Sequence, residues 1–273
     1  DLGTLTTRAR AASAAHMGSA GRRKSGTGEN FWQYRRHTSE DGADRVDWRR
    51  SAREEHLFVR ETELETARTF LFWVDPTPGF NWSSGATIPF KADRALLLSM
   101  ALAGALSRSG ERCGALGGGR GAVSGARAPS RVGEDVRNFK PDTPFPKPPR
   151  DTAAVVVCSD FYSPLDEWRA RLTPIAAKCR AGVLLQVCDP VEEGYPFNGR
   201  VRFFRPGQDR ERLIGRAESS RDGYLDKFEK RRADMLALAG ELGWRFVTHV
   251  TSEEARTPLG KLAYGFAVSG AAA

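Results

Sequence analysis

The chain is poor in cysteine: it has four among 273 residues, and no two have the CxxC spacing of zinc knuckles and thioredoxin-type redox sites. It also lacks a long hydrophobic run. The longest, residues 95–106, is interrupted by Ser99 and Gly104 and is too short to cross a bilayer. No signal peptide is visible at the start. We therefore expect a cytoplasmic protein with buried, reduced cysteines and no integral membrane segment.

The common catalytic motifs are missing as well. The sequence contains no GxxxxGK[ST] phosphate loop, no HExxH zinc motif and no GxSxG nucleophile motif. Its four histidines are far apart in the sequence, and His249 lies in a predicted strand, where a structural role is the simpler interpretation. We see no catalytic constellation and expect a protein that is not an enzyme.

The chain is basic overall, with 42 Lys and Arg against 34 Asp and Glu and a net charge of +8. Residues 1–60 carry 12 basic and 8 acidic side chains, and residues 108–150 carry 9 and 4. Apolar residues make up 40%, which is typical of a folded globular protein. Nonspecific nucleic-acid binding through the two basic regions remains an alternative function.

Short apolar runs without alternation predict strands that are buried on both faces, as in a parallel sheet. Such runs occupy residues 70–74, 153–158, 183–188 and 246–250.

Helical patterns separate these runs. One helix is predicted over residues 91–107, a second between the cap Ser163 and the terminating Gly182, and a third over residues 222–242. Residues 112–150 are rich in Gly and then in Pro, which predicts a long irregular connection with one or two short strands.

Alternation of strands and helices predicts an α/β fold with a mainly parallel, doubly wound sheet. We assign this domain to residues 67–273 and an arm of strands and loops to residues 1–66.

Acidic residues directly follow three of the predicted strands: Asp75, Asp160 and Asp189. If the strands before Asp75 and Asp160 are neighbours where the strand order reverses, both carboxylates face one crevice. With the hydroxyls of Thr77 and Ser159 nearby, these oxygens would suit Mg²⁺ or Mn²⁺. The alternative is that Asp75 and Asp160 only cap the turns that follow.

Aromatic and basic residues are interleaved between Phe31 and Arg53. One interpretation is base stacking and phosphate contact with single-stranded nucleic acid. A second is a strand whose aromatic face packs on the sheet while its arginines pair with Asp41, Asp44 and Asp47. A third is a polar network that fixes the arm to the domain, formed by Arg35, Asp47, Trp48 and Arg53.

Several segments resemble the bacterial domain-of-unknown-function 58 (DUF58) family, in its short soluble form. They are GRRKSGTGENFWQYRR at 21–36, Asp41, RVDW at 45–48, SAR at 51–53, DPVEEGYPFNGRVRF at 189–203, GW at 243–244, and HVT at 249–251. The similarity extends from about His16 to Phe266. The binding or structural residues that it marks are Arg35, Arg36, Asp41, Arg45, Asp47, Trp48, Arg53 and Asp189.

This resemblance implies a three-layer sandwich like that of von Willebrand factor A domains, and a polar network in the arm. It also implies an adaptor module that works with a MoxR-type AAA+ ATPase or its client. Such domains hold a metal through an Asp-x-Ser-x-Ser motif and a later Asp, which fall here on residues 75–79 and Asp160. Thr77 keeps the first hydroxyl and Gly79 lacks the second, so the metal site of Asp75, Thr77 and Asp160 is degenerate. A metal-assisted phosphoesterase or nuclease is the alternative, although no lysine or general base is identifiable near the strand ends.

Overall fold

The computed structural model describes most of the chain, which divides into two compact units. The smaller unit is Ser19–Ala67, and the larger consists of Asp1–Gly18 and Arg68–Ala273. The described residues are 4, 7–9, 25–38, 41–53, 56–63, 67–150, 152–179, 181–204, 206–207 and 211–262.

The smaller unit is a two-stranded antiparallel sheet with short helical turns. Strand β1 (Ser25–Arg36) pairs with β2 (Phe58–Glu63). Between them lie the 3-10 turn η1 (Ala43–Arg45) and the short helix α2 (Trp48–Ser51). Strand β1 belongs to this separate sheet and not to the central sheet of the larger unit.

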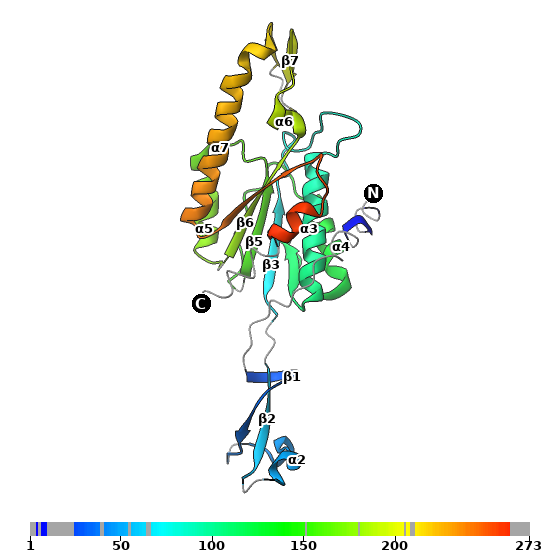
Figure 1. Ribbon diagram of the computed structural model, residues 1–273, viewed down its shortest axis with the longest axis vertical. Helices are drawn as coiled ribbons and strands as arrows, with labels where there is room; N and C mark the ends of the chain where they lie inside the picture. Colours follow the sequence, from blue (N-terminus) through cyan, green and yellow to red (C-terminus); the bar gives the residue numbers. More distant parts are fainter. Residues whose placement is uncertain are drawn as a thin grey trace. The chain divides into compact units, whose positions relative to one another are not determined.

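The larger unit is built on a five-stranded sheet in which every pairing is parallel (Figure 1). The strand order is β4-β3-β5-β6-β9. The bounds are β3 (Thr69–Val74), β4 (Arg112–Ala115), β5 (Thr152–Ser159), β6 (Ala181–Cys188) and β9 (Arg245–Val250).

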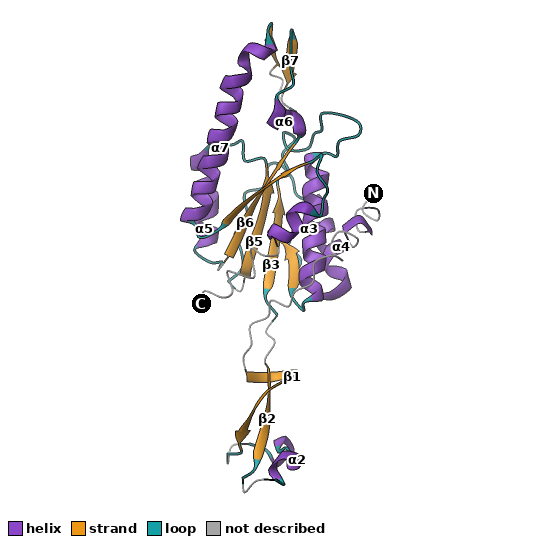
Figure 2. Cartoon of the chain, viewed as in Figure 1, coloured by secondary structure: helices purple, strands orange, loops and turns teal. Residues whose placement is uncertain are grey.

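Helices cover both faces of this sheet, which gives a three-layer Rossmann-like sandwich (Figure 2). Helices α3 (Lys91–Arg108) and α4 (Ala128–Arg137) pack on one face, and α5 (Leu165–Ala176) and α7 (Arg221–Glu241) pack on the other. No helix among the described residues is long and apolar enough to cross a membrane.

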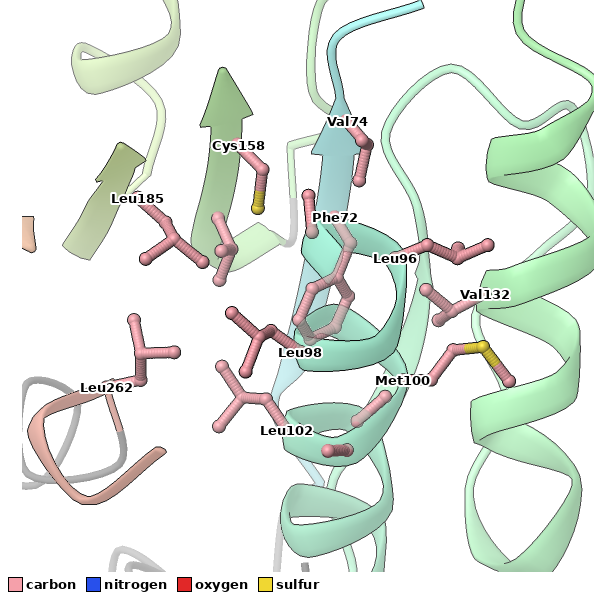
Figure 3. Packing of buried hydrophobic residues seen from close by; sticks show 14 of the residues in the cluster. Phe72, Val74, Leu96, Leu98, Met100, Leu102, Val132, Cys158, Leu185 and Leu262 are labelled. Carbon is pink, nitrogen blue, oxygen red and sulfur yellow. The ribbon is translucent and has the colours of Figure 1, made fainter. Parts of the chain in front are cut away.

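Side chains of β3 alternate between the two cores, as the period of a strand requires. Phe70, Phe72 and Val74 contribute to the α3 side, and Leu71 and Trp73 to the α5 side. Figure 3 shows the first core, where residues of α3 and α4 surround Phe72. The residues that it labels are Phe72, Val74, Leu96, Leu98, Met100, Leu102, Val132, Cys158, Leu185 and Leu262.

The smaller elements of the larger unit lie in the connections between its strands and helices. They are η2 (Gly125–Arg127), α6 (Pro190–Gly194), the antiparallel hairpin of β7 (Val201–Phe204) and β8 (Glu211–Ile214), and η3 (Ala217–Ser220).

The four predicted strands and three predicted helices are present, with two corrections. Gly182 lies inside β6 and does not end α5, which stops at Ala176 and has no side-chain cap from Ser163. The connection at 112–150 contains the predicted short strand, β4, but also a ten-residue helix, α4. Pro129 lies in the first turn of that helix, where its missing N–H is not needed.

Candidate functional site

A pocket of about 390 Å³ lies at the carboxyl ends of β3 and β5. The chain leaves β3 for β4 on one side and later returns to β5 on the other, so the strand order reverses here. The charged side chains of its lining are those of Asp75, Asp160 and Arg171. The rest is mostly apolar or small: Trp73, Pro76, Thr77, Pro78, Gly79, Pro141, Thr143, Pro144, Phe145, Ser163, Pro206 and Gly207.

Asp75 follows β3 directly, and its position is fixed by the neighbouring strand. Its backbone N–H donates to the carbonyl of Cys158 at 2.9 Å. One carboxylate oxygen accepts from the N–H of Thr77 at 2.9 Å, and the other accepts from the Ser159 hydroxyl at 2.6 Å. Asp75 is only 8% exposed, and no cation pairs with it among the described residues. Its charge is therefore held by hydrogen bonds alone.

Asp160, by contrast, is paired with a buried lysine. The ammonium group of Lys91, the first residue of α3, lies 2.9 Å from Asp160 Oδ2 and 2.8 Å from Glu192 Oε1. The other oxygen of Asp160 accepts from the N–H of Tyr162 at 3.1 Å. The sequence interpretation that no lysine lies near the strand ends is therefore corrected, because α3 begins at this edge of the sheet.

Three aromatic rings complete the surroundings of the Lys91 ammonium. Its nitrogen lies 5.6 Å from the ring centre of Phe80, 5.1 Å from that of Trp82 and 5.4 Å from that of Tyr162. Ring faces attract cations, most strongly where water is excluded, and Lys91 is 0% exposed.

Charge and burial act against each other in this cluster. Burial works to lower the pKa of Lys91, but the carboxylates of Asp160 and Glu192 outweigh it and hold that pKa above its ordinary value. Burial raises the pKa of both carboxyl groups and outweighs the attraction of Lys91, and repulsion from a neighbouring acid adds to the rise. The two ion pairs therefore favour the protonated form of Lys91.

Asp189 is fully buried and organises the third strand end. Its carboxylate accepts from the N–H of Val191 at 3.0 Å and from that of Ser84 at 2.9 Å. Its own N–H donates to Glu192 Oε2 at 2.8 Å, which completes a capping box at the start of α6. Glu192 thus binds Lys91 with one oxygen and the Asp189 backbone with the other.

The oxygens predicted to hold a metal are largely engaged in these contacts. The Thr77 side chain is exposed, and the hydroxyl of Ser83, farther along the same loop, lies within hydrogen-bond distance of the carbonyls of Gly85 and Ile88. A divalent ion bound to Asp160 would lie close to the Lys91 ammonium and be repelled by it. Among the described residues, no three His, Cys, Asp or Glu side chains are grouped to hold a metal. The carboxylate oxygens of Asp75 and Asp160 are thus already used in hydrogen bonds or an ion pair, which argues against a Mg²⁺ or Mn²⁺ site here.

The residues predicted in the arm make contacts within the smaller unit. Arg35 binds both carboxylate oxygens of Asp41, at 2.6 and 2.5 Å, and Thr38 donates to the same carboxylate. The hydrogen bonds from Arg35 and Thr38 hold the pKa of Asp41 well below its usual range. Asp47 accepts from the N–H of Arg50, which caps α2, and from the Tyr34 hydroxyl.

The other predicted residues of the arm are at its surface or outside the described part. Trp48 is 62% exposed, and Arg36 and Arg53 are also exposed. The side chains of Phe31, Trp32 and Arg45 lie outside the described residues. The contacts of Arg35 and Asp47 show local polar pairing within the arm.

Comparison with known proteins identifies the family. A family model described as "Protein of unknown function DUF58" matches residues 33–234, about three quarters of the chain. The chain belongs to the DUF58 family. Within this DUF58 chain the match includes the pocket and both strands that carry its acids. No curated protein and no solved structure matches the chain.

Lys91 and Glu192 are the two site residues that sequence reasoning missed. A signal for Glu192 was present, because Asp189-Pro-Val-Glu192 has the spacing of a capping box. The signal for Lys91 was weaker: it is a charged residue at the start of an apolar helix, where a lysine is ordinarily exposed.

Proposed function

We propose that this DUF58 chain is a non-enzymatic protein-interaction module whose docking site is the pocket at the ends of β3 and β5. The observation that carries the proposal is the pocket itself, at the point of the sheet where α/β proteins bind ligands. Buried Lys91 is held between two carboxylates, which argues against its use as the base of a phosphoesterase.

The chemistry of the pocket favours a segment of protein with an apolar residue and a basic one. Prolines and the edge-to-face pair of Trp73 and Phe145, whose ring centres are 4.6 Å apart, provide an apolar wall. The carboxylate of Asp75 lines the pocket and forms no ion pair with a described side chain. A lysine or arginine of the partner would supply the missing counter-charge.

The family resemblance found in the sequence favours one class of partner. We propose a MoxR-type AAA+ ATPase, or a client of that ATPase, because DUF58 proteins with a von Willebrand factor A-like domain resemble partners of these ATPases. In this proposal the chain supplies the docking surface and the ATPase supplies the energy.

Binding of the purified chain to the MoxR-type ATPase of the same organism, measured by biolayer interferometry, tests this function. Thr77 is exposed at the pocket, so Thr77→Arg adds bulk and positive charge there and should weaken binding at least about tenfold. Ala177→Arg is the matched control, because Ala177 is exposed just after α5 and outside the pocket. Equal weakening by both variants, or by neither, would contradict docking at this pocket.

A further inference from the structure

The environment of Lys91 is that of a bound cation. Its ammonium nitrogen contacts one oxygen of Asp160 and one of Glu192, at 2.9 and 2.8 Å, and it is shielded completely from water. The two carboxylates come from different parts of the chain: Asp160 follows β5, and Glu192 lies in α6. The ammonium thus joins the start of α3 to two loops at the carboxyl edge of the sheet.

The carboxylate oxygens of this cluster have little capacity for a second cation. The remaining oxygens of Asp160 and Glu192 accept backbone N–H groups, from Tyr162 and Asp189 respectively. Both oxygens of neighbouring Asp75 also accept hydrogen bonds. A metal that used Asp160 would have to displace the ammonium or lie directly beside it.

We propose that the Lys91 ammonium is the resident cation of this site, in place of a divalent metal, and that the pocket works without metal. The lysine would neutralise the acidic strand ends and hold the loops in place, which are the structural tasks that a bound ion would otherwise perform. The proposal concerns the site of the proposed function, but its test uses the chain alone, so a missing partner and a wrong cation assignment give separate results.

The first test is isothermal titration calorimetry, in which MgCl₂ or MnCl₂ is titrated into the EDTA-treated wild-type chain. We expect no saturable binding at millimolar concentrations. Saturable binding that is lost in both Asp75→Ala and Asp160→Ala would overturn the proposal, because the acids would then hold a metal beside the ammonium. The expected result needs only the wild-type chain, and the two variants are needed, in folded form, only if the wild type binds a salt.

The second test removes the resident cation. Lys91→Ala leaves Asp160 and Glu192 facing a space without positive charge, so the same salts should raise the melting temperature of the variant by several degrees, saturably. The rise should disappear in Lys91→Ala/Asp160→Asn and be absent in Lys230→Ala, where the lost lysine is exposed and lies in α7. If Lys91→Ala is folded and neither salt raises its melting temperature, the result would contradict the proposal that the ammonium takes the place of a metal ion. If this variant is unfolded without salt, refolding by Mg²⁺ or Mn²⁺ supports the proposal and failure to refold counts against it.

Discussion

A buried ammonium group is stable only where nearby charges replace the hydration that it loses. Lys91 meets this condition twice, through Asp160 and Glu192, and its ammonium nitrogen also lies over three aromatic rings. The two acids depend on the lysine in the same way, because each is less than 9% exposed. At the scale of single residues, the site therefore behaves as one coupled charge cluster.

Replacing Lys91 with methionine should destabilise the fold strongly. The variant keeps the volume of the side chain but leaves Asp160 and Glu192 buried without a counter-charge, a change that typically costs about 3–5 kcal/mol. Urea denaturation followed by circular dichroism measures the loss. Lys230→Met is the control, because the Lys230–Asp234 pair is largely exposed and such pairs contribute little. Similar losses in the two variants would argue against a coupled buried cluster.

His249 should make the stability of the fold depend on pH, with a loss of stability in acid. Its Nε2 faces Arg94 at 3.2 Å, and because a guanidinium can only donate, the folded protein holds the neutral ring with its proton on Nδ1. Burial, with the nearby charge of Arg94, lowers the pKa of His249 from 6.5 to about 4. Between these two values the unfolded chain binds a proton that the folded chain does not, so stability falls as the pH falls through this window.

The size of this effect is about 3 kcal/mol, at 1.36 kcal/mol for each pH unit. Chemical denaturation of the wild type and of His249→Gln, at several pH values across the window, measures it. The two stability curves should diverge by about this amount, since glutamine does not titrate. His56→Gln, at an exposed position of the smaller unit, should follow the wild type. Parallel curves for wild type and His249→Gln would show that folding does not lower the pKa of His249.

At the scale of elements, the packing of β6 against the residue before β9 requires a glycine. A Cβ atom built on Gly182 would lie 2.1 Å from Cδ2 of Trp244, far inside van der Waals contact. Trp244 is itself 6% exposed and belongs to the core between the sheet and helices α5 and α7. The indole ring therefore lies flat against the backbone of β6, and only glycine leaves room for it.

Gly182→Ala should therefore cost about 1–3 kcal/mol, the usual range for overpacking of a core. Gly240→Ala makes the same chemical change inside α7, where a Cβ meets no atom within 4 Å. There alanine should stabilise the helix by up to about 1 kcal/mol. Thermal unfolding of both variants gives the comparison. Destabilisation by Gly240→Ala, or tolerance of Gly182→Ala, would contradict this account.

Gly182 also illustrates which features of the fold could not be predicted from the sequence. Apolar runs identified β3, β5, β6 and β9, and helical periodicity identified α3, α5 and α7, because these signals are local. The glycine was interpreted as the end of α5, since its contact with Trp244 comes from a distant part of the chain. Helix α4 was missed because it lies within residues 112–150, whose Gly-rich and Pro-rich composition predicted an irregular connection, although it packs on α3.

The residues of the candidate site also fall into two groups, those that could be predicted from the sequence and those that could not. Asp75, Asp160 and Asp189 follow strand ends, so their position at one edge of the sheet could be predicted from the sequence. The pairing of Lys91 with Asp160 could not, because it depends on where α3 begins in space and not on a sequence motif. The charge of a site is a tertiary property, because it depends on residues that lie far apart in the sequence.

At the scale of the whole molecule, the reactivity of the four cysteines shows whether the three-layer sandwich is closed. They lie in or beside different elements of the larger unit: Cys113 in β4, Cys158 in β5, Cys179 after α5 and Cys188 in β6. All four are unpaired with one another and buried. Burial raises the pKa of every one of these thiols, that of Cys158 to about 12 and that of Cys179 to about 11.

The thiols of the native protein should therefore react very slowly with Ellman's reagent near neutral pH, since the thiolate is the reactive form and none is accessible. Full reaction of all four should follow unfolding in guanidinium.

Under native conditions we expect Cys113, Cys158 and Cys188 to react at one common rate that rises steeply with denaturant, because their exposure requires the sheet to open as a unit. Cys179, beyond the end of α5, should react through smaller openings and at lower denaturant. Mass spectrometry of labelled peptides separates the four rates. Rapid labelling of Cys158 or Cys188 without denaturant would mean that the layers on the two faces do not close the sheet as one cooperative structure.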